Sequence, residues 1–271
     1  MGWRMWFGPK SCKPTSLMDI GQQADWIRPM LPVKEPERRR RSKAITAELT
    51  KSAVQCVAAL APPIVLEIGA HEASFSRCVK SLLPGSRTVA FEPNPVVFDK
   101  YCRTATDGGV EYLPLCISDR TGRAQFIMPH TKDGAPKLSM GSLLIDTEAR
   151  RLSKLEVETT TIDSFLGGQA SQPNAIWIDV EGAVGVVLDG ATHTLRSCLL
   201  LYAEVETRQR WKEQSMDEEI IGRLGDAGFV PVLRDMQRPW QYNCLFIRKE
   251  MLANPAIIRA CEGYFGRVNA L

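Results

Sequence analysis

The sequence predicts an α/β fold: a doubly wound, mostly parallel sheet with a final antiparallel strand and a β insertion. Three observations support this prediction. Short apolar runs alternate with segments whose apolar residues recur at helical spacing, the pattern of β-α units. Residues 124–129 and 155–165 both read as strands with no helix between them, which favours an antiparallel insertion. The last two apolar runs, residues 228–232 and 244–250, are expected to pair as closing strands.

The remaining elements follow in order. Residues 42–60 have apolar side chains at roughly helical spacing, and Pro62 and Pro63 end that helix. Pro114 indicates a bulge or an edge position in the third strand. The further expected strands are residues 64–70, 87–93, 110–118, 175–181 and 198–206. The expected helices between them are residues 75–83, 95–104, 184–191 and 215–224, the last of which opens with a capping box of Ser215 and Glu218.

Composition describes an ordinary globular chain. Of 271 residues, 44% are hydrophobic and 24% are charged, and the net charge of +3 is too small to imply a nucleic-acid partner. The pattern divides the chain into an N-terminal arm (1–43), a main domain (44–250) and a helical tail (251–271). Much of the positive charge lies in Arg38–Arg41, a run more typical of a solvated face or linker than of a binding site.

Membrane and metal signals are weak. No apolar stretch reaches the roughly 18 residues that a membrane span needs. The eight cysteines form no C-x-x-C pair and no zinc-type spacing with histidine, so we expect buried free thiols in a reducing compartment. The sequence therefore predicts a cytoplasmic protein.

Acidic residues follow five consecutive strands. In sheets of this kind, ligands bind at the carboxyl ends of the strands. A single carboxylate there often caps the next helix, but five sets would converge on one edge of the sheet. These residues are Glu67 and Glu72, then Glu92, then Asp119, then Asp179 and Glu181, then Glu204 and Glu206.

The spacing of these acids favours one cofactor class. Glu92 lies 23 positions beyond Gly69, which suits a carboxylate that accepts hydrogen bonds from two ribose hydroxyls. Glu72 lies in the glycine turn and would repel phosphate by roughly 1–4 kcal/mol at 4 Å. A ligand with ribose and a positive charge fits better, so S-adenosylmethionine is favoured over NAD.

Six segments resemble the FkbM-type methyltransferases, in the order of that family and over roughly residues 64–206. They are VLEIGAHEASFS (65–76), VAFEPNP (89–95), LPLCISDRTGRAQF (113–126), LSMGSL (138–143), VETTTIDSF (157–165) and IWIDVEGAVGVVLDGA (176–191). The resemblance implies a class I methyltransferase fold with S-adenosylmethionine as methyl donor. It also implies methyl transfer, usually to a hydroxyl oxygen of a sugar, a polyketide or another small metabolite.

The resemblance also implies site residues. The implied cofactor-binding positions are Glu67, Gly69, Ala70, His71, Ala73, Glu92, Ser118, Asp119 and Asp179. The implied catalytic positions are Asp179 and Glu181, the acid pair facing the reaction centre.

Several positions depart from the family pattern. The first loop reads G-A-H-E-A where the family usually has G-A-N-x-G, so His71 replaces asparagine and Ala73 replaces glycine. A left-handed backbone at Ala73 would cost about 1 kcal/mol or more. Trp177 stands for a lysine and Val184 for a glutamate. We expect a divergent active enzyme; the alternatives are a catalytically inactive binding protein on this fold and an NAD-dependent oxidoreductase.

Methyl transfer needs a base and an aligned acceptor. Asp179 or Glu181 is the candidate base, and a metal bridged by Asp179 and Glu204 is an alternative. The segment Thr131–Leu143 and the N-terminal arm are expected to recognise a small-molecule acceptor, because loops carry specificity on shared scaffolds. Trp177 is expected to be buried under a helix.

Overall fold

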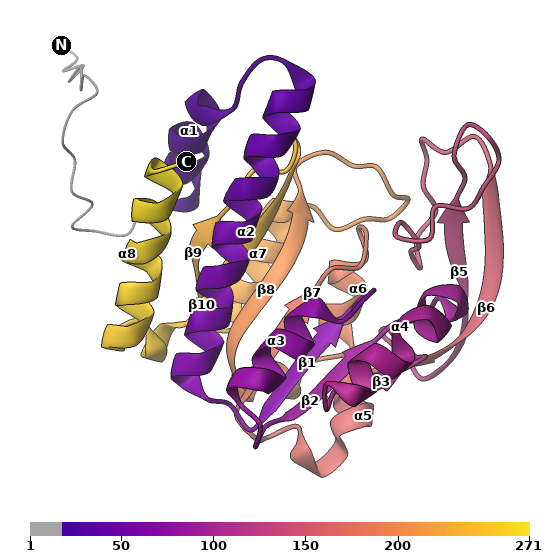
Figure 1. The fold of residues 1–271 in the computed structure, drawn as a ribbon. Coiled ribbons are helices and arrows are strands. Elements are labelled where there is room, and N and C mark those ends of the chain that lie inside the picture. The colour runs from indigo at the N-terminus through magenta and orange to yellow at the C-terminus, as the bar shows by residue number, and fades with distance from the viewer. Residues whose placement is uncertain (1–17) are drawn as a thin grey trace.

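A computed structural model describes residues 18–271 of the chain (Figure 1). Its centre is a seven-stranded sheet in the order β3-β2-β1-β7-β8-β10-β9. Neighbouring strands are parallel except β10, which is antiparallel to both β8 and β9. The strands are β1 (Ile64–Ile68), β2 (Arg87–Phe91), β3 (Glu111–Leu113), β7 (Asn174–Ile178), β8 (Cys198–Glu206), β9 (Phe229–Arg234) and β10 (Gln241–Arg248). The predicted fold class is confirmed.

Helices cover both faces of the sheet, so its central strands are buried on both sides. One face is packed by α1 (Ile20–Ile27), α2 (Glu35–Leu60), α3 (Ser74–Leu82), α4 (Pro95–Asp107) and α8 (Pro255–Asn269). The other is packed by α5 (Ile162–Leu166), α6 (Val184–Asp189) and α7 (Asp217–Asp226). Short 3-10 turns lie at Arg28–Met30, Gly167–Gln169, Thr194–Ser197 and Lys249–Met251.

The predicted β insertion forms a separate small sheet. Strand β6 (Leu152–Thr160) lies between β5 (Gly122–Pro129) and β4 (Cys116–Ile117), and β5 and β6 are antiparallel, as expected. The predicted strand does not continue to residue 165. It ends because Thr161 caps helix α5, its hydroxyl oxygen accepting from the Ser164 amide at 2.9 Å. Pro114 separates β3 from β4, and β3 is an edge strand, as its proline indicated.

Two expectations about helix starts are wrong. Helix α2 begins at Glu35 rather than near Ser42, because Pro36 fits its first turn and acidic side chains favour a helix N-terminus. The run Arg38–Arg41 therefore lies on a helix, and the expected boundary at residue 43 falls inside it. Helix α7 has no capping box, since the Ser215 hydroxyl donates to the Glu219 carboxylate at 2.8 Å.

Helix α2 packs on the face of the sheet that carries Trp177 and Tyr202. Beneath it, the buried Trp177 ring stacks on Tyr202 at 3.5 Å and on Phe75 at 4.5 Å between ring centroids, so the expected burial of Trp177 is confirmed. Residues 1–17 of the expected arm lie outside the described part of the chain. Among residues 18–271, no helix has the length and apolar character to cross a membrane.

Candidate active site

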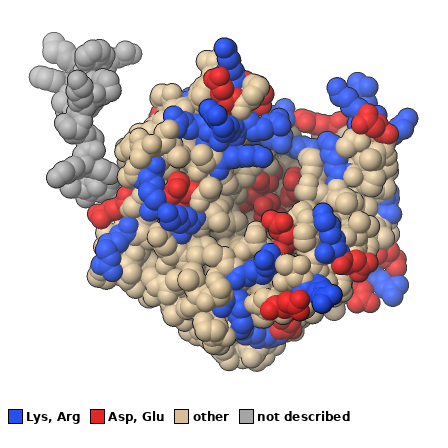
Figure 2. All heavy atoms as spheres, in the orientation of Figure 1, with Lys and Arg blue, Asp and Glu red and all other residues tan. Residues whose placement is uncertain are grey.

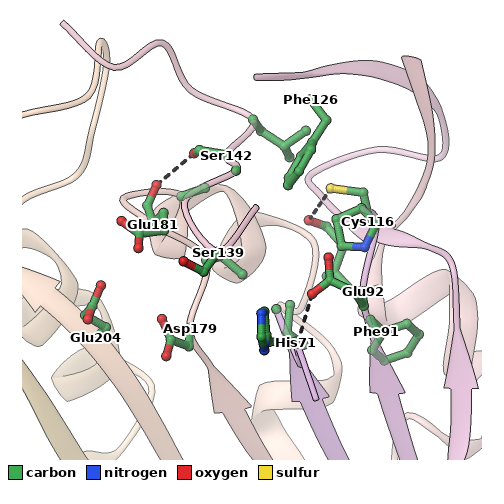
Figure 3. Close-up of a pocket in the computed structure, with 18 of the residues that line it drawn as sticks. His71, Phe91, Glu92, Cys116, Phe126, Ser139, Ser142, Asp179, Glu181 and Glu204 are labelled. Atoms are coloured by element: carbon green, nitrogen blue, oxygen red, sulfur yellow. Dashed lines mark hydrogen bonds between the residues drawn. The ribbon is translucent and has the colours of Figure 1, made fainter. Parts of the chain in front are cut away.

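Two cavities meet at the carboxyl edge of the parallel strands. The first, about 340 Å³, lies between the strand ends and the β insertion (Figure 3). A second cavity of about 500 Å³ lies beneath helix α2. Gly69, His71 and Asp179 contribute to the walls of both. The edge that the sequence predicted is therefore hollow on both sides of Asp179.

The predicted site residues divide among these cavities. Glu92 and Glu181 line the cavity between the strand ends and the β insertion, which we call the cleft. Glu67 and Ala70 line the cavity beneath α2. Of the predicted cofactor-binding and catalytic residues, Ala73, Ser118 and Asp119 line neither cavity.

The first loop is bound closely to the end of β7. Gly69 has a φ of +76°, and a Cβ atom there would lie 1.9 Å from the Asp179 carbonyl oxygen. The Asp179 amide also donates to the Ile68 carbonyl oxygen at 2.9 Å. A side chain at position 69 would therefore clash with Asp179, so glycine is required there. The close packing and the hydrogen bond fix the position of Asp179 relative to the loop.

Two further residues of this loop are left-handed without being glycine. His71 has a φ of 44° and Ala73 a φ of 53°. Such a conformation costs an L-residue roughly 1–2 kcal/mol. Ala73 therefore has the strained left-handed backbone that the sequence analysis considered, and not a right-handed helical one.

Glu92 is held in place by the backbone. One carboxylate oxygen accepts from the His71 amide and the other from the Asn94 amide, each at 2.9 Å. Burial raises the pKa of Glu92 to about 7, although both amides lower it. A carboxylate has about four acceptor positions, so these two bonds leave capacity for two ribose hydroxyls. The geometry fits the predicted ribose role.

Glu67 lies behind the loop. Its carboxylate accepts from the Ser76 amide at 2.8 Å, which ties β1 to the first turn of α3. Burial raises the pKa of Glu67 to about 7, and the charge of Asp179 raises it further while the Ser76 bonds oppose the shift. Glu67 therefore supports the loop and borders the cavity under α2.

Ser118 and Asp119, which the resemblance placed among the cofactor-binding positions, lie outside the wall of the cleft. The Ser118 hydroxyl donates to the Asp119 carboxylate at 2.9 Å, and Asp119 is exposed. The cleft wall is instead apolar, made by Phe91 and by Leu115–Ile117. In the sequence, Leu115–Ile117 form an apolar run just before Ser118 and Asp119. That run could have predicted an apolar wall, but the prediction used only the polar residues that follow it.

Four acids crowd the other end of the cleft. Burial raises the pKa of Asp179 to about 6, with repulsion from Asp235 adding to the shift. Burial, followed by repulsion from Asp179, raises the pKa of Glu181 to about 8. Burial raises the pKa of Glu206 to about 7 and that of Glu204 well above its usual range. At neutral pH, Asp179 is mostly ionised and Glu181 mostly protonated.

Two arginines act on this cluster from separate segments. The charges of Arg210 and Arg238 both lower the pKa of Glu181. Arg210 also pairs with Asp146 at 2.8 Å, both side chains being buried, which joins the segment after β8 to the insertion. These cations lie near the acid pair, where Trp177 replaces the lysine of the family pattern. Sequence reasoning missed them because neither is close to that lysine position in the chain.

The β insertion forms the roof of the cleft. Phe126, Ser139 and Ser142 line it, and the Ser142 hydroxyl donates to the Glu181 carbonyl oxygen at 2.7 Å (Figure 3). Gly141 packs against Phe126 so closely that a Cβ atom would lie 2.1 Å from the ring. The second half of the segment Thr131–Leu143 thus lines the cleft.

The alternatives drawn from the sequence find little support in this geometry. The amides of Gly69 and Ala70 donate to the Phe91 carbonyl oxygen at 3.1 and 2.9 Å, so with the His71 amide on Glu92 they are not free for a pyrophosphate. Within residues 18–271, no three or more His, Cys, Asp or Glu side chains are placed to hold a metal ion. The metal bridge of Asp179 and Glu204 stays a prediction.

A Rossmann-like sheet that ends in an antiparallel β10, with acids gathered at the ends of its parallel strands, is typical of a methyltransferase of the class I type. Residues 67–231 match the family model described as the methyltransferase FkbM domain. The chain belongs to the FkbM methyltransferase family, and S-adenosylmethionine is its methyl donor.

Named relatives extend this result. The chain is 29% identical over 165 residues to the 2-O-methyltransferase NoeI of Sinorhizobium fredii, covering 56% of this chain and 67% of NoeI. It is 28% identical over 151 residues to the hexuronic acid methyltransferase AglP of Haloferax volcanii, covering 52% of this chain and 59% of AglP. The crystal structure of methyltransferase FkbM from Methylobacillus flagellatus aligns at 13% identity and a TM-score of 0.45, covering 69% of this chain and 44% of that one.

Proposed function

We propose that this chain transfers a methyl group from S-adenosylmethionine to a hydroxyl oxygen of a sugar. The observation that carries the proposal is the position of Asp179, an acid with a pKa of about 6 in the wall shared by both cavities. The names of the two relatives, a 2-O-methyltransferase and a hexuronic acid methyltransferase, support a sugar as acceptor.

Named residues would hold the donor. Glu92 would accept the ribose hydroxyls, and Phe91 with Leu115–Ile117 would contact the adenine. The turn at Gly69 and the side of Asp179 facing α2 would border the amino-acid portion. When bound, S-adenosylmethionine supplies an electrophilic methyl group on a positively charged sulfur. The acids of the cleft stabilise such a charge by Coulomb attraction.

Asp179 is the base of the proposed reaction. Its carboxylate would take the proton of the acceptor hydroxyl as the oxygen forms its bond to the methyl carbon, while the methyl–sulfur bond breaks and S-adenosylhomocysteine leaves with that electron pair on its now neutral sulfur. A base with a pKa near the working pH is the most effective, and such groups contribute typically 10²–10⁴-fold in rate. Glu181, whose pKa is raised further than that of Asp179, is the more readily protonated acid of the pair and therefore the weaker candidate for the base. The roof residues Ser139 and Ser142 lie where they restrict the acceptor.

A catalytically inactive binding protein is the second candidate. The observation that favours it is the strained loop, with His71 and Ala73 left-handed where the family pattern has asparagine and glycine. The cytoplasmic location expected from the sequence stays a prediction.

Calorimetric titration with S-adenosylhomocysteine tests the donor site. We expect micromolar affinity for the wild type and a loss of about ten-fold or more for Glu92→Ala, since hydrogen bonds to a charged group are worth about 1.5–3 kcal/mol. Glu158→Ala is the matched control, because Glu158 is exposed on β6 and lines neither cavity. The wild type should bind NAD far more weakly. No binding of S-adenosylhomocysteine to the wild type would refute the proposal.

Turnover separates the enzyme from the binding protein. Production of S-adenosylhomocysteine should be measured over a panel of neutral, acidic and phosphorylated sugars, with amino sugars included to separate O- from N-methylation. An active sugar O-methyltransferase releases product with at least one hydroxyl-bearing member and leaves a methyl ether on it. Tight cofactor binding with no turnover on any sugar would favour the inactive candidate.

A further inference from the structure

A third cavity lies beside the cleft, between the start of helix α2 and the turn that joins β9 to β10. Its volume is about 650 Å³, and its wall includes Arg38, Arg39 and Lys43 from α2 with Gln237, Arg238 and Trp240 from the turn. We call it the basic pocket. The arginine run that the sequence assigned to a linker thus contributes two side chains to a cavity.

The basic pocket has an excess of positive charge. Glu35 is the one carboxylate in its wall, and it pairs with Arg38 at 2.8 Å and with Arg39 at 3.9 Å. Among residues 18–271, neither Lys43 nor Arg238 has an ion-pair partner. These two cations are therefore free to receive an anion, and the paired arginines add to the field.

The walls of the pocket are held together by hydrogen bonds. The Ser42 hydroxyl donates to the Met236 carbonyl oxygen at 2.8 Å, and the Thr46 hydroxyl donates to the Asp235 carboxylate at 2.5 Å. Both bonds fix α2 against the segment that carries Arg238. These bonds fix the positions of cations that come from two separate segments of the chain. The pocket is therefore a preformed site and not a chance cluster on one helix.

The pocket continues into the active site. Gln237 lines both the basic pocket and the cleft. The charge of Arg238 reaches Glu181 strongly enough to lower its pKa. Figure 2 shows lysine and arginine side chains gathered at the rim of a hollow whose interior is acidic. A molecule with its hydroxyl at Asp179 could therefore place another group among these cations.

We propose that the basic pocket binds an anionic group, a carboxylate or a phosphate, on the sugar acceptor that the active site methylates. This inference rests on the proposed function. Arginine and lysine give charge-assisted hydrogen bonds to both groups. Trp240 is half-buried, with the guanidinium carbons of Arg208 and Arg238 at 4.6 and 5.2 Å from its ring centre, so a cation–π contact holds Arg238 at the wall of the pocket. The opposite charges of cleft and pocket suit a cationic donor and an anionic acceptor.

Ligand-observed NMR with three matched probes tests the proposal. Glucose, glucuronate and glucose 6-phosphate are titrated in the presence of saturating S-adenosylhomocysteine. The tested variant is Lys43→Gln with Arg238→Gln. The control is Arg40→Gln with Arg259→Gln, which removes the same charge from exposed positions outside the pocket. We expect an anionic probe to bind the wild type and the control about ten-fold more tightly than glucose, and this preference to fall to about three-fold or less in the pocket variant.

The outcomes are distinct. Tighter binding of glucuronate alone assigns a carboxylate, and tighter binding of glucose 6-phosphate alone assigns a phosphate. Equal binding of all three probes, undetectable binding of all three, or an equal loss in the control variant would overturn the proposal. Failure of the proposed function is recognised separately, because it would abolish S-adenosylhomocysteine binding to the wild type before any sugar is added.

Discussion

The acids at the ends of β1 and β2 and those just after β7 are alike in composition but not in their partners. Glu67 and Glu92 accept hydrogen bonds from backbone amides. Within the described residues, the carboxylates of Asp179 and Glu181 receive no hydrogen bond, and burial, followed by repulsion from neighbouring acids, raises their pKa values. The first pair is fixed by the fold and suited to holding a ligand. The second pair remains available to react with one.

The strongest test of this difference is Asp179→Asn. The amide keeps the shape of the side chain but cannot accept the acceptor proton, so we expect kcat to fall by roughly 10²–10⁴-fold. The affinity for S-adenosylhomocysteine, measured by calorimetry, should change by only a few-fold because Glu92 holds the ribose. Asp226→Asn, an exposed acid on α7, is the control. A loss of affinity as large as the loss of kcat would assign Asp179 to the cofactor instead.

The pH profile should show which acid of the pair is the base. With a pKa of about 6, Asp179 must lose its proton to act, so kcat/KM should fall about ten-fold per pH unit below pH 6. Glu181→Gln should leave this limb in place, because Glu181 is already protonated there. A limb near pH 8 that disappears in Glu181→Gln would instead make Glu181 the base.

Sequence reasoning predicted the parts of this site that follow from the repeat of strands and helices. Parallel strands bring their carboxyl ends together, so Glu92 and Asp179 could be placed on one edge before any coordinates. Arg238 could not, because it reaches that edge through the turn before the antiparallel strand β10. The start of α2 was missed because consecutive arginines show no apolar periodicity. Strain at Ala73 was predicted only for the case of a left-handed backbone, because a residue type alone does not fix its backbone angles.

The crowding of acids near β8 should also affect stability. Burial raises the pKa of Glu206 from 4.5 to about 7. Because the folded state binds this proton more tightly than the unfolded state, the contribution of Glu206 to stability is present below about pH 4.5 and is lost as pH rises through 7. The free energy of unfolding is measured by urea titration at pH 5 and at pH 8. The decrease between these two pH values should be smaller for Glu206→Gln than for the wild type, by on the order of 1–3 kcal/mol. Glu158→Gln should follow the wild type, and a steeper loss in Glu206→Gln would contradict the prediction.

The smallest effect is expected on the cofactor side, in the backbone of the first loop. Ala73 is buried with a φ of 53°, a conformation that glycine adopts without strain. Ala73→Gly removes that strain but adds flexibility to the unfolded chain and deletes a buried methyl group, so we expect a net gain of only about 1 kcal/mol or less in the free energy of unfolding. Urea denaturation at one pH measures it. Ala47→Gly, at an exposed position inside α2, should instead lose about 1 kcal/mol, because glycine weakens a helix interior. If both variants are destabilised equally, the loop is not strained at Ala73, and the departure from the family pattern has no energetic cost that the cofactor site must bear.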